Sequence, residues 1–338
     1  SANLDWSNLG FAARSTNAVV CYNHKDGAWS GPTFSEDGYI KIHTLSNALN
    51  YGQAVFEGLK VLQTRSGAVC AFNPAANHAR LQNSCERLLM PEVSRELFFE
   101  GIETAVRMNA EFVPPCGTGG ALYIRPLIFG HGAQLGLGPA PEYALLFAVN
   151  PVGAYYKSGA GLQGVDALVV TEYDRAAPLG VGFVKCAGNY APDVLPSKIA
   201  KERGFSVCLY LDAKSHTYVE EFSTSNFLGV TQDGTLIAPH SPSVLPSTTK
   251  QVVLQAARDM GIAVEERPVA WSEVRELKEV AACGTAVVLT PMKSITKGNE
   301  VVSFAGHATI ERLYEHVLAL QAGDVPDVHG YLHEIKLD

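Results

Sequence analysis

A single lysine, Lys185, lies in a run of small and apolar residues, GVGFVKCAGNY, at positions 180–190. An unpaired buried charge is costly, and lysine is among the residues that are least often fully buried. One interpretation is that the side chain of Lys185 reaches the solvent from a loop. The other is that Lys185 works without its proton, because a desolvated lysine loses that proton easily and can then form a Schiff base.

Three further segments carry groups that could bind a cofactor beside this lysine. EEFSTSNF (220–227) combines carboxylates with a Ser/Thr run. LPSTTK (245–250) can begin a helix with Ser247 or Thr248 as its N-cap, and the N–H groups of a helix N-terminus bind phosphate. CGTA (283–286) is a second turn of small residues. A lysine for the Schiff base, a carboxylate for the pyridinium nitrogen and a phosphate cradle are the groups that pyridoxal phosphate requires.

The composition is that of a globular protein with an ample core. The chain has 338 residues, of which 47% are apolar and 18% charged, and this length is typical of about two domains. The net charge of -8 gives no sign of the basic surface that binds nucleic acid. No apolar run is long enough for a membrane span. The seven cysteines form no Cys-x-x-Cys pair, which favours reduced thiols. We expect a cytoplasmic protein, or a mitochondrial one if a transit peptide has been removed.

Other chemistries have weaker support in the sequence. Two histidines at helical spacing, His329 and His333, stand beside Glu334 and could hold zinc, but a third ligand is lacking, so we expect no metal site. The glycines of GHGAQLGLG (130–138) do not have G-x-G-x-x-G spacing. Neither a nucleophile elbow nor a Walker A sequence occurs.

Hydrophobic spacing predicts the elements that must position the candidate groups. Helices are expected at 79–90, 96–113, 248–261 and 307–323. Strands are expected at 121–129, 143–152, 167–173, 206–212, 217–222 and 261–269, with a hairpin over 226–239 that turns at Asp233-Gly234 and two short strands over 280–290 that break at Gly284-Thr285. Strands cluster and helices come between the clusters, which predicts an α+β protein of two lobes rather than a dinucleotide-binding alternation.

The segment 155–164, YYKSGAGLQG, is glycine-rich and lies near the middle of the chain, so it is the best candidate for a linker. We therefore predict a smaller N-terminal α/β domain at 1–154 and a larger C-terminal domain at 165–338. The C-terminal domain is expected to be rich in mixed β-structure and to bind the cofactor.

Eight blocks of sequence, from about Leu45 to Lys297, resemble the fold-type IV pyridoxal-phosphate enzymes and, among them, the branched-chain amino acid aminotransferases. They are NYGQAVFEGLK (50–60), NHARLQNSCERLLMP (77–91), LYIRP (122–126), LLFAVNPVGAYY (145–156), KCAGNY (185–190), STSNFLGV (223–230), LPSTTK (245–250) and CGTA (283–286). The blocks occur in the family's order. The segment TEYDRAAPLGVGFV (171–184), which precedes the lysine, differs from the sequence that the family usually has there.

The resemblance implies a cofactor site that holds pyridoxal 5′-phosphate. Lys185 matches the catalytic Schiff-base lysine. Glu221 matches the partner of the pyridine nitrogen, with Glu220 as the alternative if the register is shifted by one residue. Tyr190 matches the residue at the phenolic oxygen. The phosphate-binding residues that the resemblance implies are Arg80, Thr248, Thr249 and Thr285.

The resemblance also implies the substrate site and the partners. Tyr123 and Arg125, with Tyr51, match the group that accepts either an apolar side chain or the distal carboxylate of glutamate. Thr285 and Ala286 match the turn that holds the substrate's α-carboxylate. Tyr51 and Leu137 match residues that reach into the neighbouring subunit, which implies a homodimer with shared sites. Phe56 and Tyr155 complete the implied substrate-binding residues.

The expected activity is the transfer of the amino group of leucine, isoleucine or valine onto 2-oxoglutarate, with amino acids and 2-oxo acids as the small-molecule partners. The alternatives are another fold-type IV enzyme, namely an (R)-selective amine transaminase, a D-amino acid aminotransferase or a 4-amino-4-deoxychorismate lyase. A different class of alternative is a non-catalytic scaffold that binds the cofactor. The retention of Lys185, Glu221 and Arg80 argues against the scaffold.

Overall fold

The computed structural model describes residues 2–153 and 162–337, and packing divides them into two units. The first unit contains the described residues of Ser1–Tyr155 with Val184–Gly188 and Ala319–Asp338. The second contains those of Tyr156–Phe183 with Asn189–Leu318. Two segments that the sequence assigns to the C-terminal domain, 184–188 and 319–337, thus pack within the first unit. The predicted boundaries and the linker at 155–164 stay a prediction, because residues 154–161 lie outside the described residues.

The first unit contains one sheet, and each described pair of neighbouring strands in it is antiparallel. The order along the sheet is β17-β5-β4-β6-β7-β1-β2, and β3 also pairs with β6. The strands are β1 (Val19–Lys25), β2 (Ala28–Ser35), β3 (Ala54–Phe56), β4 (Leu59–Gln63), β5 (Val69–Phe72), β6 (Ala121–Gly130), β7 (Glu142–Val152) and β17 (Leu332–Glu334). The predicted strands at 121–129 and 143–152 are confirmed as β6 and β7.

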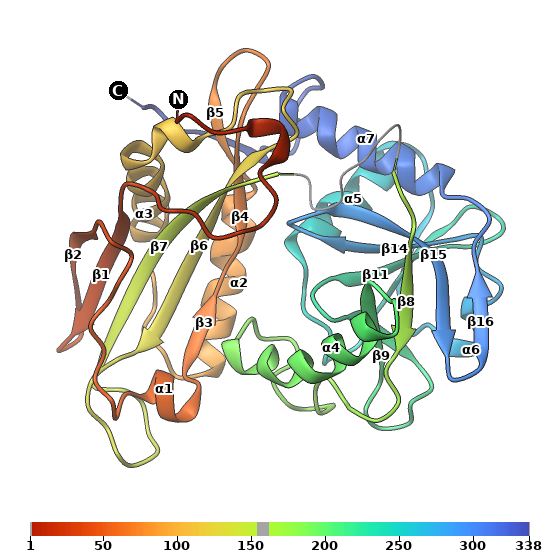
Figure 1. Ribbon diagram of the computed structural model, residues 1–338, viewed down its shortest axis with the longest axis horizontal. Coiled ribbons are helices and arrows are strands. Elements are labelled where there is room, and N and C mark those ends of the chain that lie inside the picture. Colours follow the sequence, from red (N-terminus) through yellow and green to blue (C-terminus); the bar gives the residue numbers. More distant parts are fainter. Residues whose placement is uncertain (1, 154–161, 338) are drawn as a thin grey trace. The chain divides into compact units, whose positions relative to one another are not determined.

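Helices α2 and α3 lie against one face of this sheet (Figure 1). The helices of the first unit are α1 (Asn47–Tyr51), α2 (Pro74–Arg87) and α3 (Arg95–Met108). In α3 the residues Phe98, Ile102, Ala105 and Val106, spaced at helical intervals, are buried, as the sequence predicts. The hydroxyl of Ser94 caps the helix by accepting the N–H of Leu97 at 3.1 Å.

The strands of the second unit close into a ring. The pairing runs β10-β9-β8-β15-β14-β11, and β11 pairs back to β10. A closed ring leaves none of these six strands as an unpaired edge, and β12, β13 and β16 attach outside it. The bounds are β8 (Val165–Val169), β9 (Val207–Leu211), β10 (Val219–Phe222), β11 (Asn226–Val230), β12 (Leu236–Pro239), β13 (Val264–Arg267), β14 (Glu279–Gly284), β15 (Val288–Lys297) and β16 (Glu300–Ser303).

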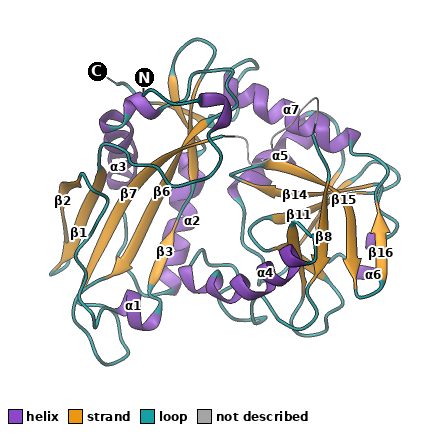
Figure 2. Cartoon of the chain, in the orientation of Figure 1, coloured by secondary structure: helices purple, strands orange, loops and turns teal. Residues whose placement is uncertain are grey.

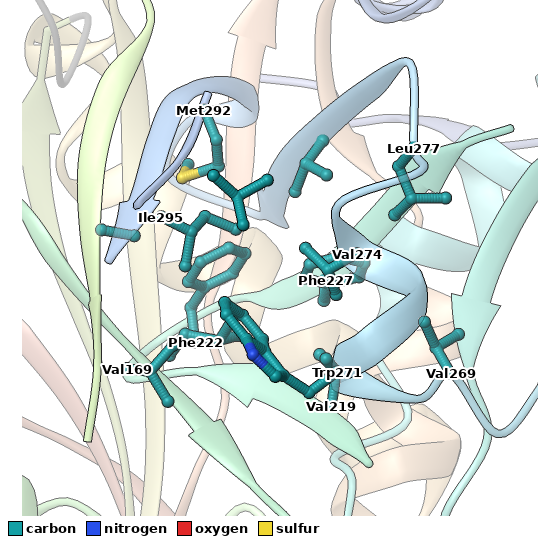
Figure 3. Close-up of a cluster of buried hydrophobic side chains, with 14 of the residues drawn as sticks. Val169, Val219, Phe222, Phe227, Val269, Trp271, Val274, Leu277, Met292 and Ile295 are labelled. Carbon is teal, nitrogen blue, oxygen red and sulfur yellow. The ribbon is translucent and has the colours of Figure 1, made fainter. Parts of the chain in front are cut away.

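Apolar side chains from every strand of the ring meet in one cluster, which Figure 3 shows. Phe222 of β10 and Phe227 of β11 stack in it with ring centroids 5.8 Å apart, and Trp271 and Val274 of α6 (Trp271–Val274) cover it. Successive side chains of a strand point to opposite faces. The neighbours of the two phenylalanines in the chain, Glu221 and Asn226, therefore point away from this core.

Strand β10 carries a β-bulge. Val219 pairs with Leu211 and Phe222 with Leu209, so β10 has one more residue than β9 between these two pairs. Both Val219 and Phe222 are part of the apolar cluster. Without the extra residue, one of the two carboxylates between them would point into that cluster. The bulge thus lets Glu220 and Glu221 both avoid the hydrophobic core.

The helices of the second unit surround the ring (Figure 2). They are α4 (Val194–Glu202), α5 (Thr248–Asp259), α6 and α7 (Ala308–Ala322), whose last residues belong to the first unit. The predicted hairpin is confirmed by the pairing of β11 with β12, and Gly234 has a φ of 90° at its turn. The α5 prediction is confirmed as well, and Gly261, with a φ of 73°, follows its end.

Two predictions need correction. His329 and His333 do not lie on a helix, because Leu332–Glu334 forms β17 and His333 pairs with Glu103 at 3.0 Å. Within the described ranges, no group of three His, Cys, Asp or Glu side chains could hold a metal ion. The strand predicted at 167–173 ends earlier, since β8 closes at Val169. No helix in the described residues has the length and apolar character needed to cross a membrane.

Candidate active site

Lys185 is fixed to the first unit by its backbone. The carbonyl of Lys185 accepts the N–H of Phe56 at 3.1 Å, and its own N–H donates to the hydroxyl of Ser84 at 3.2 Å. A β-bridge between Val55 and Cys186 adds to this attachment. The side chain is half-buried, and its Nζ lies 4.7 Å from the centre of the Phe56 ring. Lys185 is therefore a held side chain rather than one that extends freely from a loop.

The ring of Phe56 also contacts the guanidinium of Arg125, at 4.7 Å from the ring centre. Arg125 donates from Nη2 and Nε to the hydroxyl of Tyr123, at 2.9 and 3.2 Å. Arg125 and Tyr123 stand two residues apart on β6, so they share one face of the sheet. The first unit thus brings Lys185, Phe56, Tyr123 and Arg125 together. The role of Tyr123 and Arg125, with Tyr51, in accepting apolar and anionic side chains stays a prediction.

Two residues of the FEGLK stretch complete this face. Lys60 of β4 is the cross-strand partner of Tyr123, and burial lowers its pKa from 10.5 to about 8. Gly58 is required by the close approach of the Tyr123 hydroxyl, because a Cβ at position 58 would lie 2.1 Å from that oxygen. Lys60 was not predicted as a site residue, although it is the last residue of the block NYGQAVFEGLK.

Arg80 lies in α2, and its guanidinium forms a buried pair with Glu57. Nε donates to Oε1 at 2.8 Å and Nη2 to Oε2 at 2.7 Å, and the two side chains are 7% and 0% exposed. Asn77, one turn earlier in α2, also donates to Glu57 Oε2 at 2.7 Å. Two parallel bonds fix the plane of the guanidinium. The phosphate-binding role of Arg80 stays a prediction, and Glu57 is the orienting partner that the sequence analysis missed.

Glu221 forms a buried ion pair with Arg175 in the second unit, as Glu57 does with Arg80 in the first. Its Oε1 is 2.8 Å from Arg175 Nη2 and accepts the N–H of Leu245 at 3.1 Å, while its Oε2 accepts from Asn226 Nδ2 at 2.8 Å. The side chains of Arg175 and Glu221 are 8% and 6% exposed. These contacts fix the orientation of the carboxylate. Arg175 was missed because the segment that contains it, 171–184, carries no motif.

The first residues of α5 bring together a capping serine and two threonines. Ser247 caps the helix by accepting the N–H of Lys250 at 3.0 Å, and Thr248 and Thr249 are buried in its first turn. The hydroxyl of Thr249 lies 3.3 Å from that of Thr285, which stands in the turn between β14 and β15. The break predicted at Gly284-Thr285 is thereby confirmed. A helix start of this kind suits a phosphate group.

The other predicted residues have the following places. Tyr190 is half-buried and precedes a short 3-10 helix (Ala191–Asp193), and Ala286 is half-buried in the turn that holds Thr285. Tyr51 ends α1, is 46% exposed and donates its hydroxyl to the carbonyl of Leu135. Leu137, in the same loop as Leu135, is 86% exposed. Tyr155 lies outside the described residues.

Pyridoxal 5′-phosphate fits the chemistry of these groups. The start of α5 supplies hydroxyls and N–H groups for a phosphate, and Glu221 is a carboxylate suited to a ring nitrogen. Lys185 supplies an amine held against an aromatic ring. Lys185 belongs to the first unit, and Glu221 and the start of α5 belong to the second. The role of each in binding the cofactor stays a prediction.

Comparison with known proteins agrees with this chemistry. A family model described as amino-transferase class IV matches residues 54–295. The branched-chain-amino-acid aminotransferase of Helicobacter pylori is 41% identical over 335 residues, which cover 98% of each chain. The transaminase htyB of Aspergillus rugulosus is 40% identical and covers 99% of this chain and 93% of its own. The chain therefore belongs to the class IV aminotransferase family, and it is an aminotransferase of the pyridoxal-phosphate-dependent kind.

Solved structures of the same class have the same fold. The branched-chain amino acid aminotransferase of Escherichia coli superposes with a TM-score of 0.79 at 27% identity, covering 96% of this chain and 100% of its own. The T.th. branched-chain amino acid aminotransferase with pyridoxamine 5′-phosphate has a TM-score of 0.81 at 26% identity, with coverage of 95% and 99%. The predicted fold-type IV, α+β architecture is confirmed.

Proposed function

We propose that this enzyme transfers the amino group of leucine, isoleucine or valine to 2-oxoglutarate. The observation that carries the proposal is the arrangement of Lys185, Phe56, Tyr123 and Arg125 on one face of the first unit. An amine that moves protons, an aromatic surface for an apolar side chain and a guanidinium for a carboxylate are the three groups that this pair of substrates requires. The names of the bacterial relatives support the same substrates.

The residues that would hold the cofactor come from the groups described above. Thr248, Thr249, Thr285 and Arg80 would bind the phosphate, and Tyr190 would bind the phenolic oxygen, as the family resemblance implies. Glu221 keeps a proton on the ring nitrogen, with Arg175 and Asn226 fixing its carboxylate. When bound, pyridoxal 5′-phosphate supplies the carbonyl group that accepts the amino group and the ring that accepts an electron pair. The Nζ of Lys185 takes the proton from the substrate's α-carbon and returns it in the reverse half-reaction.

The same pocket has to accept both leucine and glutamate. A fully buried arginine would reject leucine, because its charge would lose its partners. Arg125 is exposed, and its Nη2 donates to the hydroxyl of Tyr123 at 2.9 Å. Leucine would then lie on the rings of Phe56 and Tyr123, and glutamate would extend its distal carboxylate to Arg125. Thr285 and Ala286 hold the α-carboxylate in both cases.

A homodimer is part of the proposal. Leu135 and Leu137 are 73% and 86% exposed, and Tyr51 is bonded to the same loop. Exposed apolar side chains that gather on one loop and an adjacent helix are typical of a protein interface. We assign Tyr51 and Leu137 to the neighbouring subunit's substrate site, as the family resemblance implies.

The proposal is tested with an amino-donor screen against 2-oxoglutarate. The purified protein should be yellow and should convert the three branched-chain amino acids. Lys185→Ala should abolish the reaction, because the group that moves the proton is lost. Lys198→Ala, which removes a lysine with a 71% exposed side chain on α4, is the matched control and should retain the wild-type rate.

Two results would contradict the proposal. Turnover by Lys185→Ala at a rate comparable to the wild type would remove Lys185 from catalysis. Activity on (R)-1-phenylethylamine with none on leucine, isoleucine or valine would assign the enzyme to the amine transaminases instead.

A further inference from the structure

A second carboxylate, Glu220, stands beside Glu221 and is almost as completely buried, with 3% of its surface exposed. Its Oε1 accepts the hydroxyl of Ser241 at 2.8 Å and also the hydroxyl of Ser243. Its Oε2 is buried without a hydrogen-bond partner in the described part of the chain. A buried carboxylate that leaves one oxygen unsatisfied is a cost to stability, so its presence calls for another explanation.

The two carboxylates bind the same segment, residues 240–247, which connects β12 to α5. Glu220 binds Ser241 and Ser243, and Glu221 accepts the N–H of Leu245 at 3.1 Å. The carbonyl of Leu245 accepts from Asn226 at 3.2 Å. The β-bulge in β10 makes this possible, because it turns both carboxylates away from the apolar core.

The same segment is linked to the partner of Glu221. Arg175 Nη2, which pairs with Glu221, also donates to the carbonyl of Ser243. The hydroxyl of Ser243 in turn donates to Glu220. A chain of direct contacts therefore runs from Glu220 through Ser243 to Arg175 and Glu221, and every member of it is within the second unit.

The segment ends at Ser247, the N-cap of α5, directly before Thr248 and Thr249. Any movement of 241–245 would shift the start of the helix and the hydroxyls that it presents. We propose that Glu220 is a positioning residue that fixes the anion-binding start of α5, while Glu221 serves the ring nitrogen. This inference rests on the proposed role of the α5 start as the phosphate site, and it gives the adjacent carboxylates separate duties.

The test compares the affinities of the protein for pyridoxal 5′-phosphate and for pyridoxal, which lacks the phosphate. After the cofactor has been removed, both are measured by absorbance titration. In Glu220→Gln the preference for the phosphorylated form should fall about tenfold, the effect of one hydrogen bond to a charged group. Ser241→Ala should lower it in the same direction and by less. Amide hydrogen exchange at 247–250 should be faster in Glu220→Gln, which is a readout independent of the cofactor.

The matched control is Glu279→Gln. Glu279 is also buried in the second unit, but it accepts the N–H groups of Thr309 and Ile310 at the start of α7. This variant should lose stability and keep the wild-type preference, as a purely structural carboxylate would.

The outcomes separate this inference from the proposed function. An unchanged preference in Glu220→Gln, or an equal loss for pyridoxal and pyridoxal 5′-phosphate, would overturn the role of Glu220. If the wild type itself shows no preference for the phosphorylated form, the phosphate site at α5 is wrong and the proposed function fails with it.

Discussion

Each of the two packing units contains one buried arginine–glutamate pair, and the two pairs are built differently. In the first unit, Arg80 presents two nitrogens to the two oxygens of Glu57, at 2.8 and 2.7 Å. In the second, Arg175 approaches Glu221 with Nη2, and the same nitrogen also donates to the carbonyl of Ser243. The first pair is a bidentate salt bridge. In the second pair, the guanidinium nitrogen that contacts the carboxylate also binds a backbone carbonyl.

The two pairs should therefore differ in what their loss affects, namely the stability of the fold or the rate of the reaction. Glu57 is satisfied by a fork from one guanidinium and by Asn77, so its removal leaves a buried positive charge without its carboxylate. Glu221 has donors on a loop, on β11 and in the segment before α5, so the loss of any one is partly compensated. We expect substitution of Glu57 to act mainly on the stability of the fold, and substitution of Glu221 to act mainly on the rate of turnover. Arg80 itself stays a proposed phosphate-binding residue.

The largest effect is expected from Glu57→Gln. Removal of one partner of a buried ion pair lowers the free energy of unfolding by about 3–5 kcal/mol. Urea denaturation of the cofactor-free protein should show this loss, because Arg80 is also a proposed phosphate-binding residue and bound cofactor would add its own contribution. The double variant Glu57→Met/Arg80→Met should recover much of it, because a buried pair replaced by apolar side chains is often neutral for stability. A loss below about 1 kcal/mol in Glu57→Gln would mean that the fork is not a stabilising element.

The same substitution in the second unit should act on turnover. Glu221→Gln should still bind pyridoxal 5′-phosphate, but a neutral amide cannot keep the proton on the ring nitrogen. The rate should fall roughly a hundredfold or more, equivalent to a few kcal/mol. Single-turnover absorbance measurements with leucine follow it directly. Glu220→Gln, one residue earlier, should lower the rate far less, and a reversed order of the two effects would place the ring-nitrogen partner at Glu220.

Local sequence patterns predicted the elements of the second unit best. The hairpin at Asp233-Gly234 and the limits of α5 depend on neighbouring residues, so they could be read directly. Helix α4 was missed because Pro196 lies in it, although proline is tolerated in a first helical turn. Strands β1 and β2 were missed as well, since β2 is largely exposed and lacks an alternating pattern.

The sequence predicted which residues form the candidate site, but it did not predict which side chains they contact. Lys185, Glu221 and Arg80 could be found because family blocks surround them. Glu57 and Arg175 were missed as their partners, because an ion pair between distant segments leaves no local pattern in a sequence. The bulge at 219–222 was also missed, since it appears in the pairing of β10 with β9 and not in the spacing of apolar residues.

Arg125 extends the comparison, because within residues 2–153 and 162–337 its partners are a hydroxyl and two aromatic rings rather than a carboxylate. Such an arginine can exchange its partners for a substrate. Arg125→Met should weaken glutamate and 2-oxoglutarate more than leucine or valine, by about 1.5–3 kcal/mol, the usual range for a hydrogen bond to a charged group. Following the two half-reactions separately by cofactor absorbance measures the difference. Equal losses for leucine and glutamate would rule out the dual role of Arg125.

The smallest effect concerns Lys60, the cross-strand partner of Tyr123 on β4. Burial lowers the pKa of Lys60 from 10.5 to about 8 in the folded protein. Below pH 8 the lysine is charged in both states, and the penalty for burying it is fully present. Between pH 8 and 10.5 the unfolded chain still binds a proton that the folded protein has lost, so stability should rise with pH.

Lys60→Met should therefore be more stable than the wild type at pH 7, and the rise between pH 8 and pH 9, below about 1.4 kcal/mol, should disappear. Thermal or urea denaturation at a series of pH values measures both quantities. Lys198→Met is the control, because its side chain is 71% exposed and its removal should leave the pH profile unchanged. If the profiles of Lys60→Met and the wild type run parallel, the lysine keeps its ordinary pKa. Its charge would then be available to a substrate throughout the physiological range, as that of Arg125 is.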